Sequence, residues 1–190
     1  MPAITVRPYR PDDAADLGRT YYELYDERDA GELVGITLFV DRPPLEGEKD
    51  WYETQYARVQ KGEMIYMVAE VDGHAVGSCT VARVGYTEAS EQAHVGELGI
   101  LVGRSMRAKG VGTALLEETL AVARTKFEVV YLSVFAFNVG AQRLYERFGF
   151  TVCGVLPRAV KRGDQYFDLV RMVRVFERTP PPPGPTVKPR

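Results

Sequence analysis

Hydrophobic and polar residues alternate along several short stretches of the chain, which is the pattern of strands with one buried face. Other stretches repeat their apolar residues at helical spacing, and residues 116, 120, 123 and 127 fall on one such face. The strands predicted from these patterns are residues 4–9, 64–71, 75–84, 93–102, 129–135, 151–160 and 165–175. The predicted helices are residues 11–25, 48–61, 110–126 and 138–148. The resulting order is β-α-α-β-β-β-α-β-α-β-β.

Local signals indicate how these elements connect. Asp72-Gly73 is a two-residue hairpin signal, so the strands on either side of it are expected to be antiparallel. A helix separates the strands at 93–102 and 129–135, which implies a parallel pair with a right-handed crossover. Residues 31–47 contain several prolines and glycines and are expected to form an irregular loop. We therefore predict a mixed α/β sheet in a single domain.

The end of the chain differs in kind from the rest. Residues 179–190 include the run Pro-Pro-Pro-Pro-Gly-Pro, which lacks backbone donors and has almost nothing to bury. We expect a passive, disordered tail there, with a Pro-rich ligand for a partner protein as the alternative. The predicted domain accordingly spans residues 1–178.

Composition adds exclusions to this picture. The formal net charge is −2, so no strong positive field favours nucleic acid or an acidic membrane surface. We find no stretch with the apolar length of a signal peptide or a membrane span. Cys79 and Cys153 match no metal signature and lie in apolar stretches, so both are expected to be core residues. A cytoplasmic protein with no metal, nucleic-acid or membrane partner is expected.

A stretch with two glycines follows the strand at 93–102, and its sequence is Arg107-Ala108-Lys109-Gly110-Val111-Gly112-Thr113. The first N–H groups of a helix have no partner inside it, and the helix dipole favours negative charge there. Glycines allow close approach and two basic residues add positive charge, so the stretch suits a phosphate or pyrophosphate. Glycines placed for packing alone are the alternative. A Walker A loop is excluded because Lys109 precedes the glycine, and a dinucleotide fingerprint because Leu115 replaces its third glycine.

Two residues of the helix at 138–148 also bear on function. Asn138 suits the N-cap position, where its side chain accepts a backbone hydrogen bond. Tyr145 follows about two turns later and so points to nearly the same side. Capping and amphipathic packing are the alternative explanations for these two side chains.

Together these stretches resemble the Gcn5-related N-acetyltransferase (GNAT) superfamily. Its acyl-CoA motif, Arg/Gln-x-x-Gly-x-Gly/Ala, is matched by Arg107, Gly110 and Gly112. Its next motif, Asn-x-x-Ala-x-x-Leu-Tyr-x-x-x-Gly-Phe, is matched by Asn138, Ala141, Leu144, Tyr145, Gly149 and Phe150. The resemblance covers residues 2–176 and implies the mixed α/β fold of that superfamily. Residues 94–102 and 161–168 look like members that acetylate free amino acids or related small amines, and phosphinothricin-type acetyltransferases share much of the same pattern.

The resemblance implies acetyl-CoA as co-substrate. In the family, the end of one strand splays from its parallel neighbour and its free backbone groups pair with the pantetheine arm. The corresponding residues here are Ile100, Leu101 and Val102, and one N–H among them would polarise the thioester carbonyl. Residues 107–113 would hold the pyrophosphate, and the side-chain amide of Asn138 would contact the cofactor.

The same resemblance assigns the proton transfers. The amine must attack as the free base, although simple amines are mostly protonated at neutral pH, so a base is needed, often acting through water. Glu97 is the first candidate and His94 the second, with a surface salt bridge as the alternative role for Glu97. Tyr145 would protonate the departing thiolate.

Substrate choice is expected to come from residues 31–44, the helix that follows them and the turn near Gly163. Candidate lining residues are Thr37, Tyr52, Tyr166 and Asp168, with ordinary packing as the alternative for each.

The sequence thus predicts an enzyme that transfers the acetyl group of acetyl-CoA to a primary amine of a small molecule such as an amino acid. One alternative is a protein N-terminal or lysine acetyltransferase, and another is a non-catalytic acyl-CoA sensor. The presence of both Asn138 and Tyr145 argues against the sensor. Members of the family are often dimers, so a homodimer is a candidate assembly.

Overall fold

The computed structural model describes residues 3–85 and 88–176, so the predicted tail at 179–190 lies outside the described residues. The order of helices and strands predicted from the sequence is confirmed. The strands are β1 (Thr5–Pro8), β2 (Met64–Val71), β3 (His74–Arg83), β4 (Val95–Val102), β5 (Val129–Phe135), β6 (Thr151–Arg162) and β7 (Gln165–Val175). The α-helices are α1 (Ala14–Asp29), α2 (Leu45–Gln60), α3 (Val111–Lys126) and α4 (Val139–Arg147). Short 3-10 turns, η1 (Pro11–Asp13) and η2 (Arg104–Met106), precede α1 and α3.

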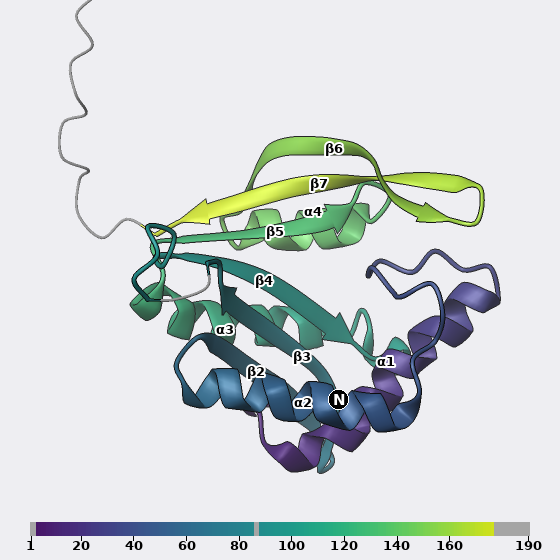
Figure 1. Ribbon diagram of the computed structural model, residues 1–190, viewed down its shortest axis with the longest axis horizontal. Helices are drawn as coiled ribbons and strands as arrows, with labels where there is room; N and C mark the ends of the chain where they lie inside the picture. The colour runs from purple at the N-terminus through teal and green to yellow at the C-terminus, as the bar shows by residue number, and fades with distance from the viewer. Residues whose placement is uncertain (1–2, 86–87, 177–190) are drawn as a thin grey trace, which may run out of the picture.

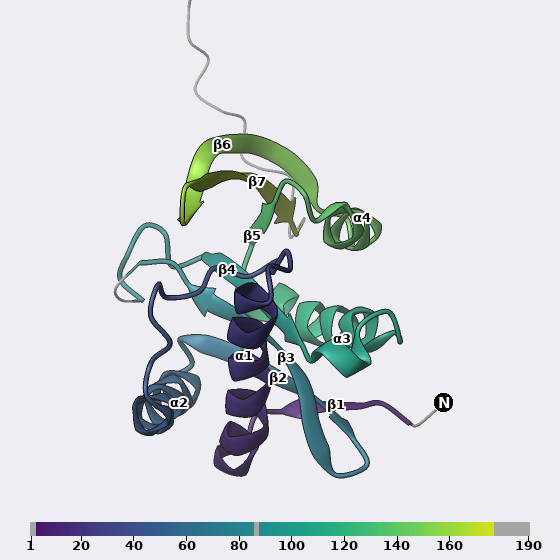
Figure 2. The same ribbon diagram turned by 90° about the vertical axis from the view of Figure 1, so that its right-hand side faces the viewer.

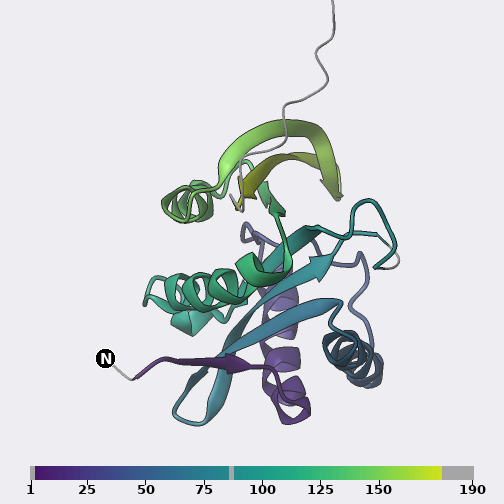
Figure 3. The same cartoon turned by 90° about the vertical axis from the view of Figure 1, so that its left-hand side faces the viewer.

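The described strands form one seven-stranded sheet in the order β1-β2-β3-β4-β5-β7-β6. Neighbouring strands are antiparallel except β4 and β5, which are parallel, as the intervening helix predicted. Figure 2 and Figure 3 show α3 and α4 on one face of the sheet and α1 and α2 on the other. The helices thus cover the sheet from both sides, which is the arrangement that buries its central strands.

The larger hydrophobic core lies between α3 and the sheet. The predicted apolar face of this helix, formed by Leu116, Leu120, Ala123 and Phe127, is buried there against side chains of the central strands. A second, smaller cluster on the opposite face joins α1 and α2 to β2 and includes the fully buried Leu17. Burial of side chains of this size stabilises the fold by about 1.5–3 kcal/mol each.

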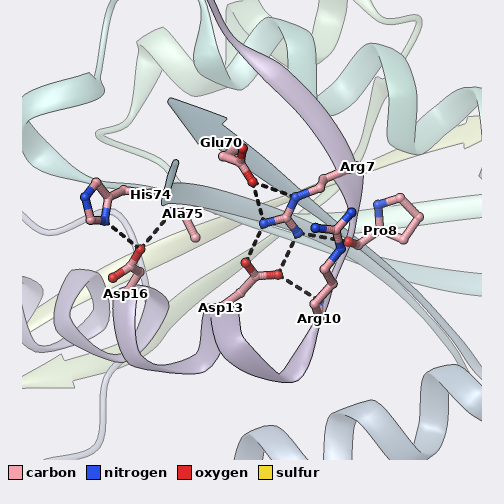
Figure 4. Close-up of polar contacts among 8 residues, drawn as sticks. All are labelled: Arg7, Pro8, Arg10, Asp13, Asp16, Glu70, His74 and Ala75. Atoms are coloured by element: carbon pink, nitrogen blue, oxygen red, sulfur yellow. Dashed lines mark hydrogen bonds and ion pairs between the residues drawn. The ribbon is translucent and has the colours of Figure 1, made fainter. Parts of the chain in front are cut away.

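An ionic cluster around Arg7 ties β1 to β2 and to the start of α1 (Figure 4). The guanidinium of Arg7 donates to both carboxylate oxygens of Asp13, at 2.7 and 2.8 Å, and its Nε donates to Glu70 at 2.7 Å. Asp13 also accepts a hydrogen bond from the backbone N–H of Arg10 at 2.7 Å. The bonds from Arg7 to Asp13 are the main reason that the pKa of Arg7 is raised above its ordinary value.

Some sequence expectations need correction. Cys79 is buried as predicted, but Cys153 is exposed because β6 is the edge strand of the sheet and its first eight residues are uncovered. The first α-helix continues four residues beyond the predicted end at Tyr25, to Asp29, and the backbone turns at Gly31 with φ of 84°. Among the described helices none is long and apolar enough to cross a membrane.

The feature that prepares a site is the divergence of β4 from β5 (Figure 1). Their parallel ladder has three paired positions, and the last is Glu97 opposite Tyr131. Beyond it, β4 stays paired with β3 as far as Val102, while β5 is paired with β7. One side of the second half of β4 is therefore left without a strand partner.

Candidate active site

A cavity of about 1380 Å³ occupies the region where β4 and β5 diverge. Its lining comes from the second half of β4, the stretch before α3, the end of β5 and α4. Residues of α1, α2, the loop before α2 and strands β2, β3 and β7 complete it. The cavity thus brings together segments that are distant in the sequence.

The predicted phosphate-binding stretch lies at the N-terminus of α3. Ala108 and Gly110 both have positive φ, 58° and 89°, and Gly110 caps the helix without a side-chain hydrogen bond. The first N–H groups of α3 therefore lack an intrahelical acceptor, and the dipole favours an anion beside them. Five of the seven predicted residues line the cavity, namely Arg107, Ala108, Gly110, Gly112 and Thr113. Val111 is instead buried in the core, and Lys109 is exposed outside the lining.

The side chain of Arg107 has a partner that the sequence did not indicate. Its guanidinium donates to both carboxylate oxygens of Glu27 on α1, at 2.6 and 2.8 Å, and its Nε donates to the carbonyl of Val102 at 3.1 Å. Glu27 is 4% exposed, so its carboxylate is buried and paired. This ion pair fixes the turn before α3 and offsets the charge of Arg107. An anion placed here would therefore be held chiefly by backbone N–H groups.

The backbone of β4 offers hydrogen-bonding groups to the cavity. Gly103 donates to Val76 of β3 at 2.9 Å, and backbone groups point to alternate sides along a strand. The N–H and C=O groups of Ile100 and Val102 therefore face the gap, whereas those of Leu101 face β3. All three predicted residues line the cavity.

Asn138 and Tyr145 both line the cavity from the side of α4. Asn138 is the N-cap, as predicted, and its Oδ1 accepts from the N–H of Ala141 at 3.2 Å. Tyr145 is buried, and its ring meets that of Phe150 edge to face at 6.0 Å. Burial is the main reason that its pKa is raised, so the phenol keeps its proton at neutral pH.

Comparison with known proteins identifies the family of the chain. The model of the acetyltransferase (GNAT) family matches residues 35–150. The chain belongs to this family. It is 30% identical over 111 residues to the L-amino acid N-acetyltransferase AaaT of Escherichia coli, a match that spans 57% of this chain and 67% of that protein.

Solved structures confirm that this acetyltransferase has the fold expected from its sequence. The ribosomal-protein-alanine N-acetyltransferase from Brucella melitensis aligns with a TM-score of 0.77 at 25% identity, over 90% of this chain and 99% of that one. An acetyltransferase from Salmonella typhimurium, solved with its cofactor acetyl-CoA, aligns with a TM-score of 0.76 at 22% identity, over 96% and 99% of the two chains.

The two candidate bases of the acetyltransferase lie beside the cavity and not in its lining. Glu97 is exposed at the last paired position of β4, opposite Tyr131, and after burial its charge is a cause of the raised pKa of that tyrosine. It lies on the same face of β4 as Gly99, which does line the cavity. His94 is exposed before the start of β4. None of the described lining residues is a histidine, aspartate or glutamate.

The loop before α2 covers the other end of the cavity and is held by two arginines. Arg162 of β6 donates to the carbonyls of Val34 and Ile36, at 2.8 and 2.7 Å. Arg28 of α1 donates to the carbonyls of Phe39 and Val40, both at 3.0 Å. Arg162 lies 128 and 126 positions from Val34 and Ile36 in the sequence, which is why local patterns gave no sign of its contacts.

The predicted substrate-lining residues divide into two pairs. Thr37 and Tyr52 line the cavity, whereas Tyr166 and Asp168 do not. Tyr166 lies under the guanidinium of Arg158, 4.0 Å from its ring centroid, and Asp168 accepts the backbone N–H of Arg158 at 2.7 Å. The latter two therefore organise the β6–β7 hairpin. Among the described residues, no group of three or more histidine, cysteine or acidic side chains is placed to hold a metal ion.

Proposed function

We propose that this acetyltransferase transfers the acetyl group of acetyl-CoA directly to the primary amine of a small molecule such as an amino acid. The observation that carries the proposal is one cavity that is lined by the free edge of β4, the first turn of α3 and Tyr145. The named activity of the Escherichia coli relative supports an amino-acid acceptor.

The donor end of the cavity fits an anionic diphosphate. The N–H groups of Val111, Gly112 and Thr113 lie in the first turn of α3, where the helix dipole favours the phosphates. The described lining carries no carboxylate that would repel them. Asn138 keeps its side-chain NH₂ for the donor because its Oδ1 is used by the helix cap.

The free edge of β4 can orient the rest of the donor. The backbone groups of Ile100 and Val102 pair with an extended amide-containing arm as a neighbouring strand would, while the side chain of Leu101 contributes to the wall. When acetyl-CoA is bound, its thioester supplies the activated acetyl carbon. An N–H of β4 aimed at the thioester oxygen stabilises the negative charge that develops there.

Tyr145 and Glu97 carry the proton transfers in this proposal. The protonated hydroxyl of Tyr145 donates to the departing thiolate, and its burial keeps it protonated until then. The carboxylate of Glu97 takes the proton of the amine through water at the edge of the cavity.

Donor binding is tested by calorimetric titration of Gly112→Asp with acetyl-CoA. A Cβ at this position meets Leu144 Cδ2 at 3.3 Å, the flexible end of a side chain, so the variant is expected to fold. The added charge should weaken binding by about 10-fold or more, because it lies where the phosphates are expected. Gly154→Asp is the matched control, since a Cβ there meets nothing within 4 Å and the site lies on exposed β6. Equal affinity in the parent and Gly112→Asp would remove the donor assignment.

The acceptor class is tested by release of the CoA thiol with amino acids, simple amines and peptides. We expect turnover with small amines. A second candidate, acetylation of a protein N-terminus, is favoured by the name of the Brucella melitensis neighbour. Turnover with an alanine-initiated peptide and none with small amines would establish that second function instead.

A further inference from the structure

Aromatic rings from α2, the end of β5 and the loop before α2 line the cavity, and we take the part they line as its acceptor end. Tyr52 and Trp51 of α2 have their rings 4.9 Å apart at nearly a right angle. Phe135 and Phe137, at and after the end of β5, have ring centroids 5.0 Å apart. Phe39 lines the cavity from the loop. Rings facing one space from several elements favour a flat or bulky apolar group between them.

Charged groups that could bind a second polar end of an acceptor are scarce. Among the described lining residues none is acidic or lysine, and two are arginines. Arg107 is occupied by Glu27. Arg147 lies in the last turn of α4, roughly 13 Å along the helix from Asn138. A second ammonium group at the acceptor end would lose its hydration without gaining a counter-charge, which is unfavourable.

The rim of the cavity exposes large apolar side chains. Phe39 is 67% exposed and Trp51 is 48% exposed, although both line the cavity. Covering these rings with an apolar part of the acceptor removes hydrocarbon from water on both partners.

From these observations we infer that the acceptor is a primary amine that carries an aromatic ring or a bulky hydrocarbon group close to the amine. The inference rests on the proposed small-molecule acetyl transfer and narrows its substrate class. Aromatic amino acids and arylalkylamines share this chemistry. Polyamines, aminoglycosides and acidic amino acids lack it.

The first test compares kcat/KM across a matched panel at fixed acetyl-CoA. Phenethylamine and phenylalanine, which differ by a carboxylate, should each exceed putrescine, lysine and glutamate by about 10-fold or more, since burial of one large apolar group is worth at least that factor. The ratio of kcat/KM for phenethylamine to that for phenylalanine tells whether the site prefers an arylalkylamine or an aromatic amino acid. Equal or better rates with the charged amines would overturn the inference.

A binding measurement separates this inference from the proposed activity. Trp51 is the single tryptophan of the chain, so its emission reports ligands at the acceptor end. Titration of the CoA-loaded protein with phenethylamine should shift this emission at concentrations about 10-fold below those of putrescine. If phenethylamine binds in this way but no amine is acetylated, the preference of the cavity for aromatic amines stands and the proposed function fails. If putrescine binds as well as phenethylamine, the inference fails even when acetylation occurs.

A pair of neighbouring residues provides the variants. Phe39 lines the cavity, whereas Val40, which is 85% exposed, does not. Phe39→Ala should raise KM for phenethylamine by about 5- to 10-fold and leave acetyl-CoA affinity unchanged, because a ring of the acceptor wall is lost. Val40→Ala should leave both values unchanged. An equal KM in all three proteins would contradict the ring's contribution to the acceptor site.

Discussion

At the scale of single residues, Tyr145 is both a core residue and part of the cavity wall, and one substitution separates these roles. Tyr145→Phe keeps the ring that packs on Phe150 but removes the proton donor. We expect kcat to fall by about 100-fold, while melting temperature and acetyl-CoA affinity stay close to the parent values. Steady-state rates, thermal melting and calorimetry on one preparation measure all three.

Tyr166→Phe is the matched control for this substitution, because Tyr166 is exposed on the β6–β7 hairpin and outside the cavity. Its kcat should equal that of the parent. If Tyr145→Phe is also within about twofold of the parent, Tyr145 is a packing residue and the thiolate leaves without its help.

Glu97 gives a prediction about pH. Glu97→Gln keeps the size of the side chain but cannot accept a proton, so turnover at neutral pH should fall by about 10-fold or more. The free-base fraction of the amine rises with pH, so the deficit should shrink as pH rises towards the pKa of the substrate. This effect is measured as the ratio of parent to variant rates from about pH 6.5 to about pH 9.5, because the free-base fraction of simple amines grows over this range. A constant ratio would assign the loss to structure, and no loss would move the role to water alone.

At the scale of the elements, the loop before α2 depends on Arg162. Its guanidinium bonds to two loop carbonyls and lies over the ring of Phe135 at 4.7 Å, and burial lowers its pKa. Arg162→Met removes both hydrogen bonds and should raise KM for the amine by about 10-fold, with acetyl-CoA affinity retained. The neighbouring exposed Lys161→Met serves as the control. A fall in kcat with KM unchanged would mean that the loop does not position the acceptor.

The attachment of β1 yields a prediction about stability. Asp13 is 6% exposed and depends on Arg7, so Arg7→Met leaves a buried carboxylate without its cation and should cost about 3–5 kcal/mol. Arg19→Met removes an ion pair with Asp16 whose arginine is 66% exposed, and should cost less than about 1 kcal/mol. Urea unfolding of the two variants and the parent gives both values. Equal small losses would show that the buried cluster adds no more than a surface pair.

Local signals predicted the elements well because strand alternation, the Asp72-Gly73 turn and the Asn138 cap act over a few residues. The bounds of β2, β5 and β7 agree residue for residue with the prediction. The pairs Arg107–Glu27 and Arg162–Val34 join residues 80 and 128 positions apart, and neither leaves a local pattern. Of the aromatic wall of the acceptor end only Tyr52 was predicted, since the rings come from α2, β5 and the loop, which are distant in the sequence.

At the scale of the whole molecule, the two parts of the sheet meet through the short β4–β5 ladder, and a ligand in the cavity contacts both parts. Acetyl-CoA at 100 times its Kd should stabilise the protein by about 2.7 kcal/mol and raise Tm by roughly 5–10 °C. Hydrogen exchange should slow at the amides of Ile100 and Val102 but stay unchanged at Leu101, which faces β3. Slowing at Leu101 alone would contradict the assigned side of β4.

The donor site proposed here is built mainly from main-chain groups, and this has an evolutionary consequence. Every non-proline residue supplies the same N–H and C=O, so many side-chain replacements at positions such as Ile100 and Val102 leave the hydrogen bonds available. The acceptor wall, in contrast, is made of particular rings on a loop and on α2. Mutational drift in such a lineage should therefore change which amine is modified long before it changes the acetyl donor. Divergent relatives of this acetyltransferase can be expected to differ in the amine they acetylate more than in the acetyl donor they use.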